Sequence, residues 1–196
     1  MPSFLLFCMA QIPLSTINTF LQLPGHNFFS LVRDTSQSTS DPIATSPPVD
    51  GFTSAFMNTD QIRDYLSNPN APMIGDLEPC QYAYLDERGA RDYTVVLAHS
   101  YKALEMQDPT TMTEDELAQW DTELEERADE PDDMWREWRV KFKDAERLST
   151  ILSLESDFTV KLYDDDFLAA HVAAEGILQL ETAWAAFVAA SSSAGE

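Results

Sequence analysis

The fold is decided by residues 81–98, which read QYAYL, DERGARD and YTVVLA in turn. The two outer stretches are short and rich in aromatic and apolar residues, which is typical of strands. Residues 86–92 between them are charged and turn-like, so we predict a hairpin of two antiparallel strands. The second strand, 93–98, is almost continuously apolar, which indicates a central place in its sheet.

Further strands and helices are predicted on both sides of this hairpin. Residues 138–142 alternate apolar and basic side chains, which predicts a half-exposed strand, and 158–163 is a second candidate strand. Helices are predicted at 59–66, at 144–153 and, as one long C-terminal helix, at 167–188. Because a hairpin breaks the strand–helix alternation of a doubly wound sheet, we predict an α+β fold. Its mixed or antiparallel sheet has about four strands covered by helices.

Composition divides the chain into four parts. We expect residues 1–33 to form an apolar N-terminal arm and residues 34–50 to form a disordered linker or long loop. The linker is rich in Ser, Thr, Asp and Pro, and it holds too few apolar residues to offset the entropy of ordering. Residues 51–190 are expected to form an acidic α+β domain, followed by a frayed tail at 191–196.

The apolar run from Phe4 to Ala10 bears on the cellular compartment. A secretory signal needs basic residues before its apolar run, whereas the first base in this chain is Arg33. The run is also far shorter than the roughly 20 apolar residues that cross a bilayer.

Cys8 and Cys80 match neither a disulfide scaffold nor a zinc spacing. We expect a cytoplasmic or nuclear protein without a membrane partner; a secreted protein with a cleaved leader is the alternative.

Negative charge is concentrated in one segment of the chain. The net charge is −22, from 12 Lys and Arg against 34 Asp and Glu. Residues 105–133 alone contain thirteen acids and one base, Arg127. Such a charge repels nucleic acids and anionic lipids and attracts basic proteins or peptides. Nucleic acid is therefore not an expected partner.

A helix is predicted within this acidic segment. Thr113 and Glu116 form a capping box, in which each side chain satisfies a backbone N–H group of the other residue. The helix should extend to about Ala128, with apolar residues on one face and mostly acids on the other. The apolar face carries Leu117, Trp120 and Leu124.

The acidic side of this helix is the candidate contact surface for a basic partner. Its partner-binding residues would be Glu114, Glu116, Glu123, Glu125 and Glu126. The alternatives are a solvated surface, mimicry of nucleic-acid phosphates, or packing of the helix on the nearby basic strand, which would cancel the charges internally. The bases in question are Arg136, Arg139, Lys141, Lys143 and Arg147.

A different function is suggested by three consecutive aspartates, Asp164, Asp165 and Asp166, which follow the candidate strand at 158–163. Carboxylates at a strand end can bind Mg²⁺, Mn²⁺ or Ca²⁺. Aspartate is equally a favoured helix cap, and this role needs no metal. His99, at the end of the apolar strand, is the candidate catalytic residue of such an enzyme.

No family resemblance emerges from these features, and no glycine-rich phosphate motif is present. The leading hypothesis is a non-catalytic protein-interaction domain that uses the acidic helix and needs no cofactor. The alternative is a small divalent-metal-dependent enzyme with Asp164 and Asp166 at its metal site and His99 nearby.

Overall fold

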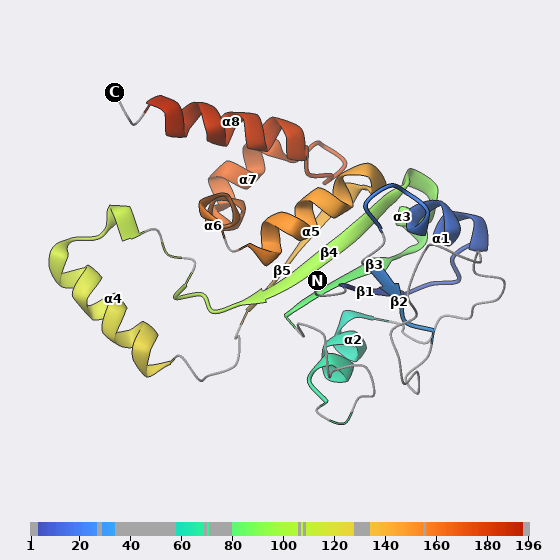
Figure 1. Ribbon diagram of the computed structural model, residues 1–196, viewed down its shortest axis with the longest axis horizontal. Helices are drawn as coiled ribbons and strands as arrows, with labels where there is room; N and C mark the ends of the chain where they lie inside the picture. Colours follow the sequence, from blue (N-terminus) through green and yellow to red (C-terminus); the bar gives the residue numbers. More distant parts are fainter. Residues whose placement is uncertain are drawn as a thin grey trace.

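A five-stranded mixed sheet forms the centre of the molecule (Figure 1). The computed structural model describes residues 4–26, 29–33, 58–68, 70, 80–105, 107, 109–127, 134–154 and 156–193. The strands follow the order β2-β1-β3-β4-β5 across the sheet. They are β1 (Phe4–Cys8), β2 (Phe29–Leu31), β3 (Gln81–Leu85), β4 (Thr94–Tyr101) and β5 (Met134–Lys141). β1 runs parallel to β2 and β3, whereas β4 runs antiparallel to β3 and β5. The predicted α+β class is confirmed, with one strand more than expected.

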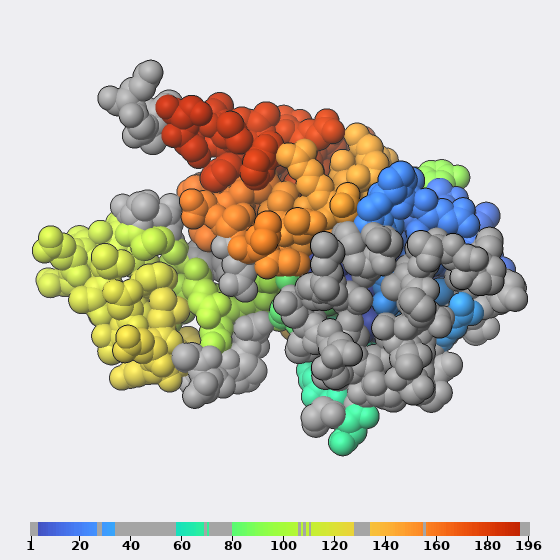
Figure 2. All heavy atoms as spheres, in the orientation of Figure 1, coloured from blue at the N-terminus to red at the C-terminus, as the bar shows by residue number. Residues whose placement is uncertain are grey.

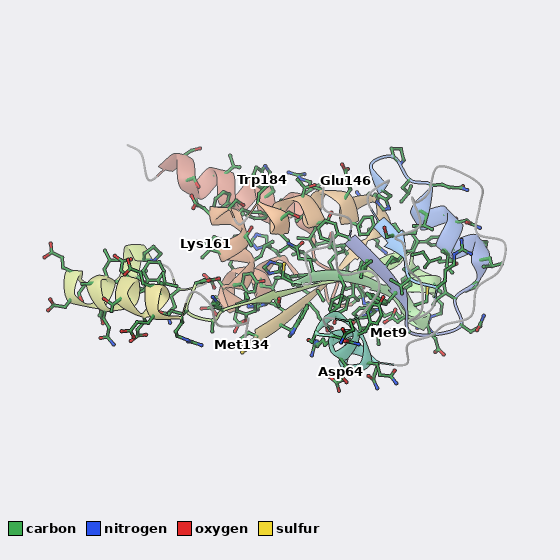
Figure 3. The ribbon with its side chains drawn as sticks, turned by 60° about the horizontal axis from the view of Figure 1, so that its bottom comes forward. Met9, Asp64, Met134, Glu146, Lys161 and Trp184 are labelled. Carbon is green, nitrogen blue, oxygen red and sulfur yellow. The ribbon has the colours of Figure 1, made fainter. Side chains whose placement is uncertain are left out.

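Helices lie on both faces of this sheet. In Figure 1, α5 to α8 lie over one face and α2 lies on the other. Figure 3 shows the same division, with Trp184 of α8 and Asp64 of α2 on opposite sides. The helices are α1 (Leu14–Leu21), α2 (Thr59–Leu66), α3 (Glu87–Asp92), α4 (Glu114–Glu126), α5 (Ala145–Ser153), α6 (Asp157–Tyr163), α7 (Asp165–His171) and α8 (Leu180–Ser193).

The apolar N-terminal segment belongs to the sheet. β1 lies between β2 and β3, so the expected separate arm at 1–33 instead supplies two strands of the main sheet. Phe4 and Leu6 pack into the core on the α5 side, whereas Leu5 and Phe7 pack into the core on the α2 side. A strand buried on both faces needs a continuous apolar run, which explains its resemblance to a leader. The linker expected at 34–50 lies outside the described residues.

The predicted hairpin is confirmed, and its connection is more ordered than a simple turn. β3 and β4 pair from Gln81↔His99 to Tyr84↔Val96. The connecting residues form the short helix α3, capped by Asp86, whose Oδ1 accepts a hydrogen bond from the Gly89 N–H at 2.6 Å. β4 is hydrogen-bonded to a strand on each side, as its apolar sequence predicted.

The strand predicted at 158–163 is wrong, because this segment is helix α6. Its residues fit a helical face as well as an alternating one: Phe158, Thr159, Leu162 and Tyr163 are all buried. The local hydrogen bonds favour the helix. The Thr159 hydroxyl donates to the Ile151 carbonyl at 2.8 Å and accepts from the Ser156 N–H at 3.1 Å, which closes a capping box.

The single long C-terminal helix predicted at 167–188 is divided into α7 and α8. Gly176 has a φ of +71°, which suits glycine and turns the chain between the helices. A bridge between Val172 and Leu178 closes this turn, and the Leu178 N–H donates to the Arg139 carbonyl of β5 at 2.8 Å. The loop therefore satisfies part of the outer edge of β5. α8 continues to Ser193, into the segment 191–196 that was expected as a tail, and the last three residues of that segment lie outside the described residues.

Candidate functional site

Helix α4 lies in an insertion between two strands that pair along their whole length. The β4–β5 register extends from Thr94↔Lys141 to Tyr101↔Met134, so the described residues between Tyr101 and Met134 lie outside the sheet. Figure 1 shows α4 apart from the sheet and the other helices, and Figure 2 shows it within a lobe that projects from the body. In Figure 3, Met134 marks the point where the insertion rejoins the sheet. The described core is thus complete without α4.

Two groups of hydrogen bonds hold the ends of α4. At its start, the predicted capping box is confirmed: Glu116 Oε2 accepts from both the Thr113 N–H and its hydroxyl at 2.8 Å. At its end, the Lys102 ammonium donates to the carbonyl of Arg127, the C-cap residue, at 2.9 Å. Lys102 is only 8% exposed, so this cation lies against the negative end of the helix dipole in a partly dry setting.

The apolar face of α4 does not reach the core. None of its thirteen residues is buried, and Leu117, Trp120 and Leu124 are half-buried at most. Trp120 is anchored instead within the insertion, where its Nε1–H donates to the Leu104 carbonyl at 2.8 Å. This bond positions the indole between α4 and the chain segment that leads to it.

A pocket of about 330 Å³ opens between α4 and that preceding segment. Leu104 and Met112 line it on one side. Four α4 residues line the other side, and their spacing of i, i+3, i+4 and i+7 places them on one helix face. They are Glu116, Gln119, Trp120 and Glu123. The pocket is therefore polar and acidic, with an aromatic wall.

The carboxylates of α4 have no basic partner among the described residues, which include every Lys and Arg of the chain. The bases of β5 and α5 lie elsewhere, so the described structure does not show the internal charge cancellation considered above. Their contacts are Arg136 with Asp165, Arg139 with Asp86, Lys141 with the Asp92 carbonyl, Lys143 with Asp144, and Arg147 with the Trp184 ring.

Hydrogen bonds from Thr113 favour the ionised form of Glu116, one of the pocket carboxylates. The hydrogen bonds from the Thr113 N–H and hydroxyl hold the pKa of Glu116 below its ordinary value. Glu123 Oε1 accepts a hydrogen bond from the Gln119 amide at 2.7 Å. Both carboxylates line the pocket.

The three aspartates lie at the start of a helix rather than at the end of a strand, with Asp164 between α6 and α7 and the other two in the first turn of α7. Asp164 caps α7, because its Oδ1 accepts from the N–H groups of Asp166 and Phe167 at 3.0 and 3.1 Å. Asp165 forms an ion pair with Arg136, and Asp166 is exposed. Among the described residues, no three His, Cys, Asp or Glu side chains are arranged to hold a metal ion.

His99, the candidate catalytic residue, is 3% exposed and lies on β4. Its Nδ1 is hydrogen-bonded to the hydroxyl of Tyr163, the last residue of α6. Arg136 also reaches Tyr163, donating to its carbonyl at 2.5 Å. The structure thus brings His99 close to the start of the aspartate run, but through a buried contact that joins the sheet to α6.

Sequence reasoning found α4 and its acids but missed the pocket. The pattern Glu116, Gln119, Trp120, Glu123 carries a detectable helical spacing. The opposite wall carries no such signal, because Leu104 is brought there by the path of the insertion. Within the described part of the chain, no helix is long and apolar enough to span a membrane. Comparison with protein families, curated proteins and solved structures finds no match for this chain.

Proposed function

We propose that this chain is a non-catalytic protein-interaction domain that binds a basic protein or peptide through α4. The observation that carries this proposal is the unpaired charge of a projecting helix. Seven of the thirteen α4 residues are acids, and no Lys or Arg side chain among the described residues forms an ion pair with them. A surface of one charge sign steers an oppositely charged partner toward itself.

The position of α4 also supports a role in binding a partner. The helix buries no residue against either core, so it adds little to the stability of the sheet. Like charges at i and i+4, such as Asp121 and Glu125, destabilise a helix slightly. A bound cationic partner would relieve this repulsion, so binding and helix stability should be coupled.

The cysteines bear on the compartment of this proposal. Cys8 is buried in β1, and neither Cys8 nor Cys80 forms a disulfide bond. Reduced thiols suit the cytoplasm or nucleus, where we place the protein. N-terminal sequencing of the natively expressed protein tests this, because a cleaved leader would favour secretion.

The test uses a decalysine peptide as the basic probe. Its Kd is measured by calorimetry from 20 to about 300 mM salt, a range over which exposed charge interactions are progressively screened. We expect Kd to rise with salt, and to rise about five- to tenfold in the variant Glu114→Gln/Glu125→Gln/Glu126→Gln. All three replaced side chains are exposed.

A matched control variant removes three exposed acids from other parts of the surface. It is Asp64→Asn/Glu87→Gln/Glu175→Gln, which changes the net charge by the same amount. If decalysine affinity falls equally in both variants, the attraction belongs to the whole protein, and α4 is not the contact surface.

A further inference from the structure

The two carboxylates that line the pocket beside α4 are separated by a defined distance along the helix. Glu116 and Glu123 line it together and lie seven residues apart on one helix face. At 1.5 Å per residue, this separates their backbone positions by about 10.5 Å. The pocket thus presents two anionic groups two helix turns apart.

The local hydrogen bonds keep that spacing between the carboxylates themselves. Glu116 reaches back to Thr113, three residues before it, and Glu123 reaches back to Gln119, four residues before it. Side chains on a helix tilt toward its N-terminus, so both carboxylates are displaced in the same direction. Their separation stays close to two turns.

Each carboxylate still has an oxygen available for a ligand. The described hydrogen bonds engage Oε2 of Glu116 and Oε1 of Glu123. Among the described residues, no Lys or Arg lines the pocket. A cation entering at either end would therefore meet a carboxylate that no base already neutralises.

Trp120 lies between Glu116 and Glu123 in the sequence of α4 and lines the same pocket. It is positioned before binding by its hydrogen bond to the Leu104 carbonyl. Leu104 and Met112 add aliphatic surface on the opposite wall. An aromatic wall attracts cationic side chains and packs well against their aliphatic stems.

We propose that this pocket binds an extended basic segment of the partner in which two arginines lie three residues apart. A chain in the polyproline II conformation has three residues per turn and advances about 3.1 Å per residue, so the side chains of residues i and i+3 lie on one face about 9 Å apart. One guanidinium pairs with Glu116 and the other with Glu123, while the chain between them crosses Trp120. This inference rests on the proposed function of α4, because it specifies the partner's chemistry at that same surface.

Arginine fits this site better than lysine. The guanidinium group offers five planar N–H donors, which suit a carboxylate, a neighbouring amide such as Gln119 and an aromatic wall together. A lysine ammonium carries the same charge but lacks the planar fork. The partner segment is therefore expected to contain Arg-x-x-Arg.

The experiment compares two hexapeptides of identical composition and charge, both blocked at their ends. One is Ala-Arg-Ala-Ala-Arg-Ala and the other is Ala-Ala-Arg-Arg-Ala-Ala. Binding to the full chain is followed by the NMR signal of the Trp120 indole N–H, assigned with Trp120→Phe. We expect the spaced peptide to bind about three- to tenfold more tightly than the adjacent one and to shift this signal. A spaced peptide with citrulline in place of arginine should not shift it.

Single substitutions test whether the preference for the spaced peptide depends on the carboxylates of Glu116 and Glu123. Either Glu116→Gln or Glu123→Gln should abolish the difference between the two peptides. Glutamine is accepted at this position of a capping box, so Glu116→Gln keeps the helix start. The matched control is Glu125→Gln, which removes the same charge from α4 outside the pocket. It should weaken both peptides equally and keep their difference.

The outcomes separate this inference from the proposed function. Equal affinity for the two peptides, or an unmoved Trp120 signal while other α4 signals shift, overturns the pocket assignment. Decalysine binding that is weakened by replacing Glu114, Glu125 and Glu126 would then still support α4 as an acidic contact surface. Loss of decalysine binding to α4 overturns both.

Discussion

Replacing Asp86 separates two contributions of a single carboxylate to the stability of the sheet. Asp86 caps α3 by accepting from the Gly89 N–H at 2.6 Å. It also forms a two-pronged ion pair with Arg139 of β5, whose guanidinium donates further to the Thr94 hydroxyl at 3.1 Å. The carboxylate thus joins the β3–β4 connection to β5. We compare Asp86→Asn, which can still cap, with Asp86→Ala, which cannot.

The expected loss of unfolding free energy follows from how exposed the Asp86–Arg139 ion pair is. The side chains of Arg139 and Asp86 are 13% and 28% exposed. Loss of one partner from a fully buried pair costs about 3–5 kcal/mol, whereas an exposed pair contributes at most about 1 kcal/mol. We therefore expect Asp86→Asn to lower the free energy of unfolding by about 2 kcal/mol. Asp86→Ala should lower it by about 3 kcal/mol, because loss of the cap adds about 1 kcal/mol.

Urea denaturation followed by far-ultraviolet circular dichroism measures both changes. With a slope of about 2 kcal/mol/M, the midpoints should fall by about 1 M for Asp86→Asn and about 1.5 M for Asp86→Ala. The control is Asp92→Asn, which breaks the half-exposed i, i+4 pair with Arg88 in the same short helix and should cost about 0.5 kcal/mol. Equal midpoints for the two Asp86 variants would refute the capping role, and an Asn variant no weaker than the control would refute the ion pair.

The pH dependence gives a second check on the same pair. Burial raises the pKa of Asp86, but hydrogen bonds from Arg139 and the Gly89 N–H, with the Arg139 charge, outweigh it and lower the pKa from 3.8. A carboxyl whose pKa is lower in the folded state stabilises the protein above its unfolded pKa. The stability difference between the wild type and Asp86→Asn should therefore be full above about pH 4 and shrink as the pH falls below it. A difference that persists unchanged at pH 2 would contradict this assignment.

Three further predictions concern other residues. Gly89→Ala should lower the free energy of unfolding by about 2 kcal/mol, because a Cβ there would overlap the Thr94 carbonyl oxygen; an unchanged Tm would contradict the close approach. Asp164→Ala should cost about 1 kcal/mol through loss of the α7 cap, while Asp164→Ser should retain most of the stability. A Mg²⁺-dependent rise in the wild-type Tm that Asp164→Ala abolishes would instead support a metal site. A thiol reagent should label half-exposed Cys80 in the native protein and reach Cys8 only on unfolding, because burial raises the pKa of Cys8 to about 12; equal labelling rates would contradict this.

Elements whose signals are local were predictable from the sequence. The capping box at Thr113 and Glu116 specifies the start of α4 within four residues, and the structure confirms it. The hairpin of β3 and β4 was likewise predictable, because two apolar runs flank a charged connection. The concentration of acids in the insertion is also a property of the sequence alone.

Elements whose sequence fits two structures were decided by tertiary contacts. Residues 158–163 match both the strand and the helix period, and the Thr159 bond to Ile151 of α5 favours the helix. The division between α7 and α8 depends on the bond from Leu178 to the edge of β5, a strand about forty residues earlier in the chain. β1 lacks alternation because it is buried on both faces, so only its neighbours reveal it as a strand.

For the candidate site, the sequence by itself determined an acidic helix with a capped start and an apolar side. Only the tertiary structure decided where that helix lies. Because β4 and β5 pair up to Tyr101 and Met134, the insertion leaves the sheet, and α4 is kept from the core and from the basic strand. Two residues before the helix then hold it in place. The Lys102 ammonium donates to the Arg127 carbonyl at the end of α4, and the Leu104 carbonyl accepts from the Trp120 indole. Such contacts depend on the path of the chain and leave no periodic signal in the sequence.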